Sequence, residues 1–182
     1  GFTNTGKYIY IIVEDQGNKP GVTYTDKELY LVVQVTDEEG KLVAKGTYMD
    51  AEGNEITDLT AVPFTNTYTV TNTTAELMVS KVLMGRNQTA GEFTFYVYDK
   101  KADGFAAEPK VIGTNAADGK VIFPSISYGQ EEMDGVAVGG KRDFIYKIVE
   151  VPGTHGGVTY SNAVIYAKIT VKHVEGRNVV ES

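Results

Sequence analysis

Apolar and polar residues alternate with a period of two along several stretches of the chain, and this spacing predicts β-strands. In residues 28–35 the leucines and valines at odd positions form one apolar face, and residues 164–171 repeat the spacing. In residues 93–98, Phe and Val alternate with Thr and Tyr. Dipeptides typical of tight turns separate such runs, at Glu39-Gly40, Glu52-Gly53, Asp103-Gly104 and Asp118-Gly119. No segment has a convincing helical period, so the predicted fold class is all-β, a β-sandwich.

A long segment of the chain occurs twice. The sequence that begins YIYIIVEDQGNKPGVTY at Tyr8 returns as FIYKIVEVPGTHGGVTY at Phe144, always 136 positions later and without a gap. We interpret this as two copies of one structural unit. The chain is then predicted to hold the C-terminal part of one unit, residues 1–72, and the N-terminal and middle part of the next, residues 73–182, which lacks its last strand. The Thr/Asn-rich stretch Thr69–Thr74 is the predicted connector.

Composition excludes several classes of function. The 182 residues carry a net charge of −7, so no basic stripe is expected that could bind nucleic acid or an anionic membrane surface. The longest apolar run, Tyr8–Val13, is too short to cross a bilayer, and no membrane insertion is expected in this segment. The chain has no cysteine, which fits either a cytosolic protein or an exported protein that is stabilised by another covalent link.

The same period of two places polar side chains on apolar faces. Lys81 shares a face with leucine and valine side chains of its own strand, and Asn66 shares one with aromatic side chains. Glu150 and its copy Glu14 each end an apolar face. Burial of such groups without partners costs several kcal/mol each, so partners or a change of protonation are expected.

Together these residue types point to one reaction. Burial favours the neutral form of an amine, which is a nucleophile, and the neutral form of a carboxylic acid, which can polarise a carbonyl and carry protons. The amine would attack the side-chain carbonyl of the asparagine, ammonia would leave, and an amide would join the two side chains. Such a bond would stabilise an exported protein that has no disulfides.

Each residue also has an ordinary interpretation. A lysine near a strand end commonly extends its ammonium group to solvent, an asparagine in a strand makes ordinary hydrogen bonds, and a glutamate at a strand end is solvated. For one residue alone the ordinary interpretation is favoured. For three such residues with the glutamate repeated, the cross-linking interpretation is favoured.

The chain resembles a known family in the ordered motifs VSKVLMGRNQTAGEFTFYVYD, ADGKVIFPSISY, FIYKIVE, GVTY and PFTNTYT. These are similar to the isopeptide-forming repeats of streptococcal-type pilin and surface adhesin proteins, and the resemblance covers nearly the whole chain. It implies an Ig-like, collagen-adhesin B-type β-sandwich in tandem units. It also implies an extracellular protein of a Gram-positive cell surface, attached to the cell wall by sortase as part of a longer protein.

The resemblance further implies an autocatalytic Lys–Asn bond that needs no cofactor. It makes Lys81 the donor, Asn66 the acceptor, and Glu14 and Glu150 the assisting acids. This is a single self-modification and not enzymatic turnover. The repeat, however, places Asn66 in the first unit and Lys81 in the second.

The partners of these two residues are therefore predicted to lie outside the chain or in another copy. Residues 71–75 span at most about 17 Å, too short for the connection to recross a domain, so closure within one chain is not expected. Either the chain is part of a longer protein, or two copies complete each other by strand exchange. The neighbouring repeat units of the same protein are the other expected partners.

The predicted function is a stalk or pilus-shaft segment that resists pulling and proteolysis. The alternative is an adhesin module that binds a host matrix protein, with the Gly-rich stretch Gly129–Lys141 as the expected binding surface. A hydrolase would need a cleft with convergent acids, which the sequence does not show. His155 and His173 are predicted to be surface residues, and without cysteines or paired spacing no metal site is expected.

Overall fold

The computed structural model describes residues 1–181, so Ser182, the last residue of the predicted second repeat unit, lies outside the described residues. The chain divides into two compact units, Gly1–Thr69 and Val70–Ser182, which we call unit 1 and unit 2. Their predicted assignment to two copies of one repeat stays a prediction. Apart from one short 3-10 turn, the regular structure of the described residues consists of strands.

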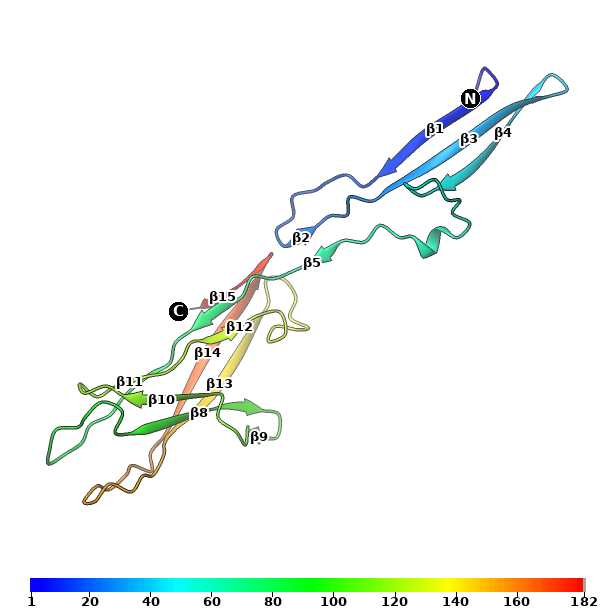
Figure 1. The fold of residues 1–182 in the computed structure, drawn as a ribbon. Helices are drawn as coiled ribbons and strands as arrows, with labels where there is room; N and C mark the ends of the chain where they lie inside the picture. Colours follow the sequence, from blue (N-terminus) through cyan, green and yellow to red (C-terminus); the bar gives the residue numbers. More distant parts are fainter. Residues whose placement is uncertain (182) are drawn as a thin grey trace. The chain divides into compact units, whose positions relative to one another are not determined.

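Unit 1 is built on an antiparallel sheet of three strands in the order β1-β3-β4 (Figure 1). Its elements are β1 (Gly6–Val13), β2 (Val22–Thr23), β3 (Glu28–Glu38), β4 (Lys41–Met49), the 3-10 turn η1 (Leu59–Ala61) and β5 (Thr67–Tyr68). The short strands β2 and β5 pair with each other, away from the three-stranded sheet. The turn between β3 and β4 has positive φ angles at Glu39 and Gly40, as a two-residue hairpin requires and as the dipeptide predicted.

Unit 2 contains one long sheet in the order β15-β14-β13-β8-β10-β11-β7, with β9 on β8, and a separate pair β12-β6. Its strands are β6 (Thr73–Ala75), β7 (Met78–Ser80), β8 (Thr94–Lys101), β9 (Gly104–Phe105), β10 (Val111–Asn115), β11 (Lys120–Ile122), β12 (Ile126–Tyr128), β13 (Lys141–Glu150), β14 (Val164–Val174) and β15 (Arg177–Glu181). All the pairings between these strands are antiparallel.

The sheet of unit 2 curls around a single core. The hydroxyl groups of Tyr128, on β12, and Tyr146, in the middle of β13, lie 2.7 Å apart and buried. The ring of Tyr128 also packs 4.7 Å from that of Phe144. Side chains from β7, β8, β11, β12, β13 and β14 belong to this same cluster or pack against it. The predicted all-β, Ig-like sandwich is confirmed.

The strands recur at the offset of the sequence repeat. Moved by 136 positions, β1 falls within β13, β3 coincides with β14, and β4 begins where β15 begins. The register recurs as well, since Gly6 pairs with Val35 as Arg142 pairs with Val171. The two segments therefore form the same antiparallel meander.

The predicted faces are confirmed where a strand has a hydrogen-bonded neighbour strand at both of its edges. Phe93, Phe95 and Val97 are buried as the period of two predicts. Tyr10 is 47% exposed, although it shares with Glu14 the face of its strand that the same period predicts to be apolar and buried. The reason is that β13 pairs with both β14 and β8, but β1 pairs only with β3 in the described structure. The outward apolar side chains of β1 are exposed too.

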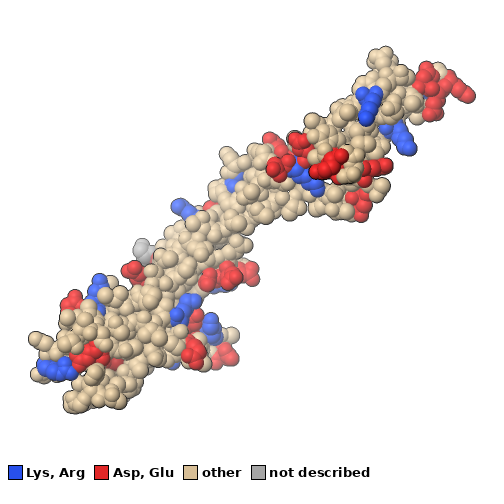
Figure 2. Space-filling model, in the orientation of Figure 1, with Lys and Arg blue, Asp and Glu red and all other residues tan. Residues whose placement is uncertain are grey.

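Charged side chains are dispersed over both units. On the face shown in Figure 2, lysine and arginine occur singly or in small groups next to acidic residues, without a continuous basic stripe. Within residues 1–181 no helix has the length and hydropathy that crossing a membrane would require.

The curled core makes a matched test possible. Ile126 is 2% exposed and Ile122 is 62% exposed, although both lie on short strands of unit 2. Ile126→Ala is expected to lower the free energy of unfolding of unit 2 by about 2–5 kcal/mol, because it leaves a cavity in the core. Ile122→Ala is expected to change it by less than about 0.5 kcal/mol. Urea unfolding followed by circular dichroism measures both, and equal effects would contradict the described core.

Candidate functional site: a buried Lys–Glu pair and a Glu–Asn pair

Lys81 directly follows β7, and the fold holds it on both sides. Its backbone N–H donates to the carbonyl of Gly119 at 2.7 Å, and the carbonyl of Lys81 accepts a hydrogen bond of 3.0 Å from Gln88 Nε2. The residue is only 9% exposed. Its Nζ lies 4.3 Å from the centroid of the Phe93 ring, a distance at which the ring face attracts a cation. The side chain therefore points into the unit and not to solvent.

Glu150 is the last residue of β13 and is 6% exposed. Its Oε1 lies 2.7 Å from Lys81 Nζ, and its Oε2 accepts a hydrogen bond of 2.7 Å from the backbone N–H of Ser161. The contact with the lysine is close, but it is not directed as a normal hydrogen bond, because Oε1 has no donor of suitable angle among the described residues. Together the two side chains form a buried ion pair, whose partners would be costly to separate.

The backbone around Lys81 leaves little freedom. Gly119 has a φ of +90°, and a Cβ atom there would lie 2.3 Å from the Lys81 carbonyl oxygen, so only glycine fits. Beneath the lysine, the Phe93 ring packs edge-on against Tyr160 with centroids 5.8 Å apart. The Phe93 N–H donates to the buried side chain of Asn115 at 2.8 Å, which fixes the start of β8.

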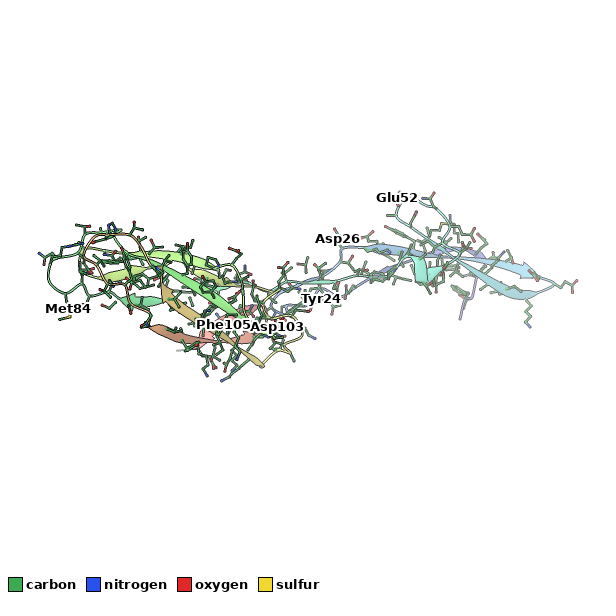
Figure 3. All side chains as sticks on the ribbon, turned by 90° about the horizontal axis from the view of Figure 1, so that it is seen from below. Tyr24, Asp26, Glu52, Met84, Asp103 and Phe105 are labelled. Atoms are coloured by element: carbon green, nitrogen blue, oxygen red, sulfur yellow. The ribbon has the colours of Figure 1, made fainter. Side chains whose placement is uncertain are left out.

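The loop from Lys81 to β8 is closed by an ion pair between Arg86 and Glu92. The carboxylate also accepts a hydrogen bond of 2.9 Å from the backbone N–H of Thr89. The Arg86 guanidinium is the main cause, and this N–H the next, of a Glu92 pKa lowered from 4.5 to about 2. At the tip of the loop, Met84 is 90% exposed and points away from the unit (Figure 3).

Asn66 lies in unit 1 and contacts the other glutamate. Its Nδ2 donates to Glu14 Oε1 at 2.7 Å, and its Oδ1 accepts from the backbone N–H of Thr25 at 2.9 Å. The second oxygen of Glu14, Oε2, is buried and has no hydrogen-bond partner among the described residues. Just before Asn66, Lys27 Nζ binds the carbonyls of residues 62 and 63 at 2.6 and 3.1 Å.

The structure thus brings the predicted residues together as two pairs. Lys81 meets Glu150 in unit 2, and Asn66 meets Glu14 in unit 1. The expectation that Asn66 is buried on an apolar face is wrong, because β5 lies beside the two-residue strand β2 and the asparagine is exposed. The roles that these pairs would have in a reaction stay predictions.

Sequence reasoning missed three groups that contact these pairs. The backbone N–H groups of Thr25 and Ser161 occupy the same repeat position, 136 residues apart, and bind Asn66 and Glu150 respectively. The only feature of the sequence that could have indicated these two N–H groups is that each directly follows a copy of GVTY. Phe93 was assigned to the core but not to the lysine, since periodicity says nothing about which neighbour covers a ring.

The two pairs suit proton exchange around an amide. The Glu150 carboxylate lies 2.7 Å from the Lys81 nitrogen, close enough to take a proton from it directly and leave a neutral amine. A carboxyl group beside an asparagine amide can polarise it and return a proton to the leaving nitrogen. Each unit therefore contains one half of the groups that amide exchange between lysine and asparagine needs.

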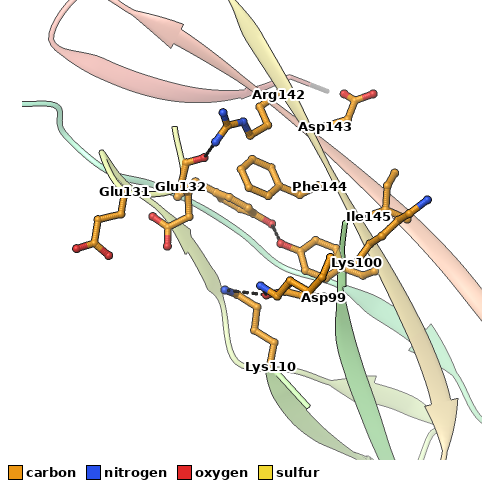
Figure 4. Close-up of a pocket in the computed structure, with 12 residues that line it drawn as sticks. Asp99, Lys100, Lys110, Glu131, Glu132, Arg142, Asp143, Phe144 and Ile145 are labelled. Carbon is orange, nitrogen blue, oxygen red and sulfur yellow. Dashed lines mark hydrogen bonds and ion pairs between the residues drawn. The ribbon is translucent and has the colours of Figure 1, made fainter. Parts of the chain in front are cut away.

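A larger cavity of about 550 Å³ in unit 2 is lined by different residues (Figure 4). Its wall includes Asp99 and Lys110, which lie 3.5 Å apart, and the hydrogen-bonded Tyr128 and Tyr146. Burial raises the pKa of both hydroxyls, so both stay protonated at neutral pH. The smaller cleft at Lys81, about 180 Å³, has the buried ion pair, and we regard it as the chemical site.

The stretch Gly129–Lys141 borders the larger cavity and is fixed to the unit. Met133 is buried in the core, and Arg142 donates to the carbonyls of Glu132 and Asp134 at 2.6 and 2.8 Å. A binding surface there would be largely preformed.

The histidines differ from each other. His155 is exposed, but the prediction that His173 is a surface residue is wrong: it is 8% exposed, and its Nδ1 lies 2.8 Å from the carbonyl of Val136. This contact fixes the end of β14 to the stretch Gly129–Lys141, which precedes β13. Among the described residues, no three His, Asp or Glu side chains are grouped so that they could hold a metal ion.

Comparison with known proteins identifies a family. The sequence model described as FctA, Spy0128-like isopeptide containing domain, matches residues 1–69 and again residues 77–181. No curated protein and no solved structure matches the chain.

The Arg86–Glu92 pair makes the loop after Lys81 sensitive to acid. Because the pKa of Glu92 is about 2 in the folded chain and 4.5 ordinarily, the pair stabilises unit 2 fully above about pH 4.5 and progressively less down to pH 2. Glu92→Gln is expected to lower the urea midpoint of unit 2 at pH 7, and the difference from wild type is expected to vanish near pH 2.

Glu108→Gln is the matched control, since Glu108 is exposed and makes no ion pair in the described part of the chain. It is expected to leave the midpoint nearly unchanged. A Glu92→Gln effect that persists undiminished at pH 2 would show that the charge of Glu92 is not its source.

Proposed function

The chain belongs to the family of Spy0128-like isopeptide-containing domains, and on this premise we propose that it is a segment of a stalk or pilus shaft whose units are cross-linked by Lys–Asn isopeptide bonds. The family is that of pilin-type structural modules. The role we assign to the chain is mechanical: to carry load between neighbouring units of a longer extracellular protein, anchored to a Gram-positive cell wall.

The observation that carries this proposal is the recurrence of one glutamate with two different partners. Glu150 touches a buried lysine, and Glu14, at the same repeat position, touches an asparagine. A solvated surface pair would explain neither the burial of Lys81 nor its position over an aromatic ring. In a complete unit one glutamate would contact both reactants.

The proposed reaction exchanges one amide for another. Glu150 takes a proton from the Lys81 ammonium group, and the neutral Nζ attacks the side-chain carbonyl carbon of an asparagine. The acid returns its proton to the amide nitrogen, the bond from this nitrogen to the carbonyl carbon breaks, and ammonia leaves. The attacking Nζ gives its second proton to the Glu150 carboxylate, from which the departing ammonia can take it as ammonium. The new bond joins Nζ to the carbonyl carbon, and no oxidant or cofactor takes part.

Such a bond would suit a protein without cysteine. Closing a loop on the order of 100 residues restricts the unfolded chain and stabilises the fold by about 4–5 kcal/mol, by analogy with a disulfide. Unlike a disulfide, an amide resists reduction. A bond between the first and last strands of a unit would also carry a pulling force past the hydrogen-bonded strands between them.

The test adds an asparagine segment to unit 2 within one chain. Appending a second copy of residues 47–72 after Ser182 places an asparagine 136 positions after Asn66, where the repeat puts it. The extended chain is expected to weigh about 17 Da less than its sequence, one ammonia. Peptide mapping is expected to find the link between Lys81 and the appended asparagine.

Three variants of the extended chain control this test. Lys81→Arg and Ala at the appended asparagine are each expected to abolish the mass deficit, and Glu150→Gln to abolish it or slow it at least 100-fold, because no carboxyl group is left to move the proton. Circular dichroism establishes that each variant is folded. A folded extended chain with an unchanged mass would overturn the proposal.

The alternative function is that of an adhesin module. The cavity of about 550 Å³, bordered by the firmly anchored stretch Gly129–Lys141, favours it, because pockets of this size commonly hold ligands. The ligand would be a charged surface segment of a host matrix protein, since the cavity is lined by lysines as well as acidic groups.

Binding to immobilised matrix proteins tests this alternative. If the chain is an adhesin, Lys100→Ala combined with Lys110→Ala is expected to weaken binding at least tenfold, whereas Lys120→Ala, outside the cavity, is expected to leave it unchanged. No binding by the wild-type chain, together with strong resistance to heat and proteases, would favour the stalk.

A further inference from the structure

The larger cavity of unit 2 has one basic wall. The cavity, of about 550 Å³, lies between the end of β8, the start of β10, the end of β12 and the first half of β13. On β8 and just before β10 stand Lys100, Lys101 and Lys110. The last two share a single acid, because Asp99 Oδ2 lies 3.3 Å from Lys101 Nζ and 3.5 Å from Lys110 Nζ. Lys100 makes no ion pair in the described part of the chain, so this wall carries more positive than negative charge.

The other wall of the cavity is acidic. It is formed by the stretch Gly129–Lys141, from which Glu131 and Glu132 line the cavity on the side away from Lys100 (Figure 4). Glu132 Oε2 accepts a hydrogen bond of 2.8 Å from a backbone N–H of the same stretch, and Arg142 is bound to two backbone carbonyls. Glu131 makes no ion pair with any described residue. A carboxylate and an ammonium group, neither of them in an ion pair, therefore lie on opposite walls.

The surface between the two walls is aromatic and apolar. Phe144 and Ile145 line it and are only partly buried. The hydroxyl groups of Tyr128 and Tyr146, which line the cavity as well, form one hydrogen bond of 2.7 Å with each other. This bond uses one of the two hydroxyl protons, and the other proton has no acceptor among the described residues. Since an unpaired buried donor costs free energy, an acceptor that enters the cavity deeply enough to reach it would be stabilised.

These features define the chemistry of a ligand. It must present an anionic group to the lysine wall, a cationic group to the acidic wall and an apolar group between them. A small anion or a polyanion fails this requirement, because it leaves the carboxylate of Glu131 unmatched or is repelled by it. An extended peptide meets the requirement, since side chains at alternate positions of such a chain point to the same side. A cavity of this size is in the range that holds small ligands.

We propose that the cavity binds an extended segment of a host matrix protein that presents an acidic, an apolar and a basic side chain at alternate positions. The acidic side chain lies between Lys100 and Lys110. The apolar side chain packs on Phe144, and the basic one pairs with Glu131. This inference rests on the alternative, adhesin function and adds the chemistry of the ligand, and it does not depend on the Lys–Asn cross-link.

Blocked synthetic peptides test this ligand. One peptide has the centre Glu-Gly-Phe-Gly-Lys, and in the others Glu, Lys or both are replaced by Gln. Titration calorimetry with the complete chain is expected to give the lowest Kd for the peptide that carries both charges. Each single replacement is expected to raise Kd about threefold, as for a partly exposed charge pair. The double replacement is expected to raise Kd about tenfold, because the two contacts lie on separate walls and their effects add.

Two variants of the chain assign the charges to the walls. Lys100→Ala combined with Lys110→Ala is expected to weaken binding of the peptides that contain Glu and to leave those with Gln in its place unchanged. Glu131→Gln is expected to weaken only the peptides that contain Lys. Pairing one change in the chain with one in the peptide isolates each contact. Lys120→Ala and Glu108→Gln, outside the cavity, are the matched controls and are expected to leave every Kd unchanged.

Equal binding of the doubly charged and the uncharged peptide would overturn the proposal, as would no binding of any peptide. Preferential binding of an oligosaccharide of uronic acids would also overturn it, because such a ligand has no cationic group. Immobilised matrix proteins distinguish this ligand from the adhesin function itself. If they bind the chain while the peptides do not discriminate, the adhesin function stands and this ligand falls; if neither binds, both fall.

Discussion

The buried contact between Lys81 and Glu150 is the constraint on which the arrangement of unit 2 depends. Taking two charged groups out of water costs several kcal/mol per ion, and only close approach with further hydrogen bonds offsets this. The 2.7 Å contact and the N–H of Ser161 supply that compensation. To make the contact, the end of β7 must reach the end of β13, although these strands are far apart in the order of the sheet. The curl of the sheet and the placement of the ion pair therefore determine each other.

The repeat explains why two glutamates have such different neighbours. Strands β1 and β13 have the same register with the strands that follow them, so Glu14 and Glu150 reach equivalent positions. The two glutamates differ in the segment that contacts the carboxylate. In unit 1 it is the segment around Asn66, and in unit 2 it is the lysine that follows β7. Combined through the repeat, the two environments contain the groups of the proposed site, in which a single carboxylate would lie between an amine and an amide.

The period of two predicted the all-β fold because successive side chains of a strand point to opposite faces of the sheet, a rule that depends only on local geometry. The alternation of apolar and polar residues identified the buried face of residues 93–97. Lys81 and Glu150 were predicted to be buried only because they fall on the apolar side of this alternation. The alternation shows on which face of a strand a residue lies, but not whether another element covers that face. Tyr10 and Asn66 are therefore exposed, contrary to expectation. Backbone donors such as the N–H of Ser161 leave no trace in residue type, so only the repeat could have indicated them.

The most direct test of the central claim is the chemical state of the Lys81 nitrogen. In the chain extended by residues 47–72 and labelled with ¹⁵N only at lysine Nζ, an isopeptide nitrogen carries one proton and resonates with amides, far from free ammonium groups. An isopeptide bond at Lys81 is expected to give one amide-type Nζ signal in the ¹H–¹⁵N spectrum, which Lys81→Arg removes and replacement of any exposed lysine retains. A folded extended chain in which every lysine Nζ gives an ammonium signal would contradict it.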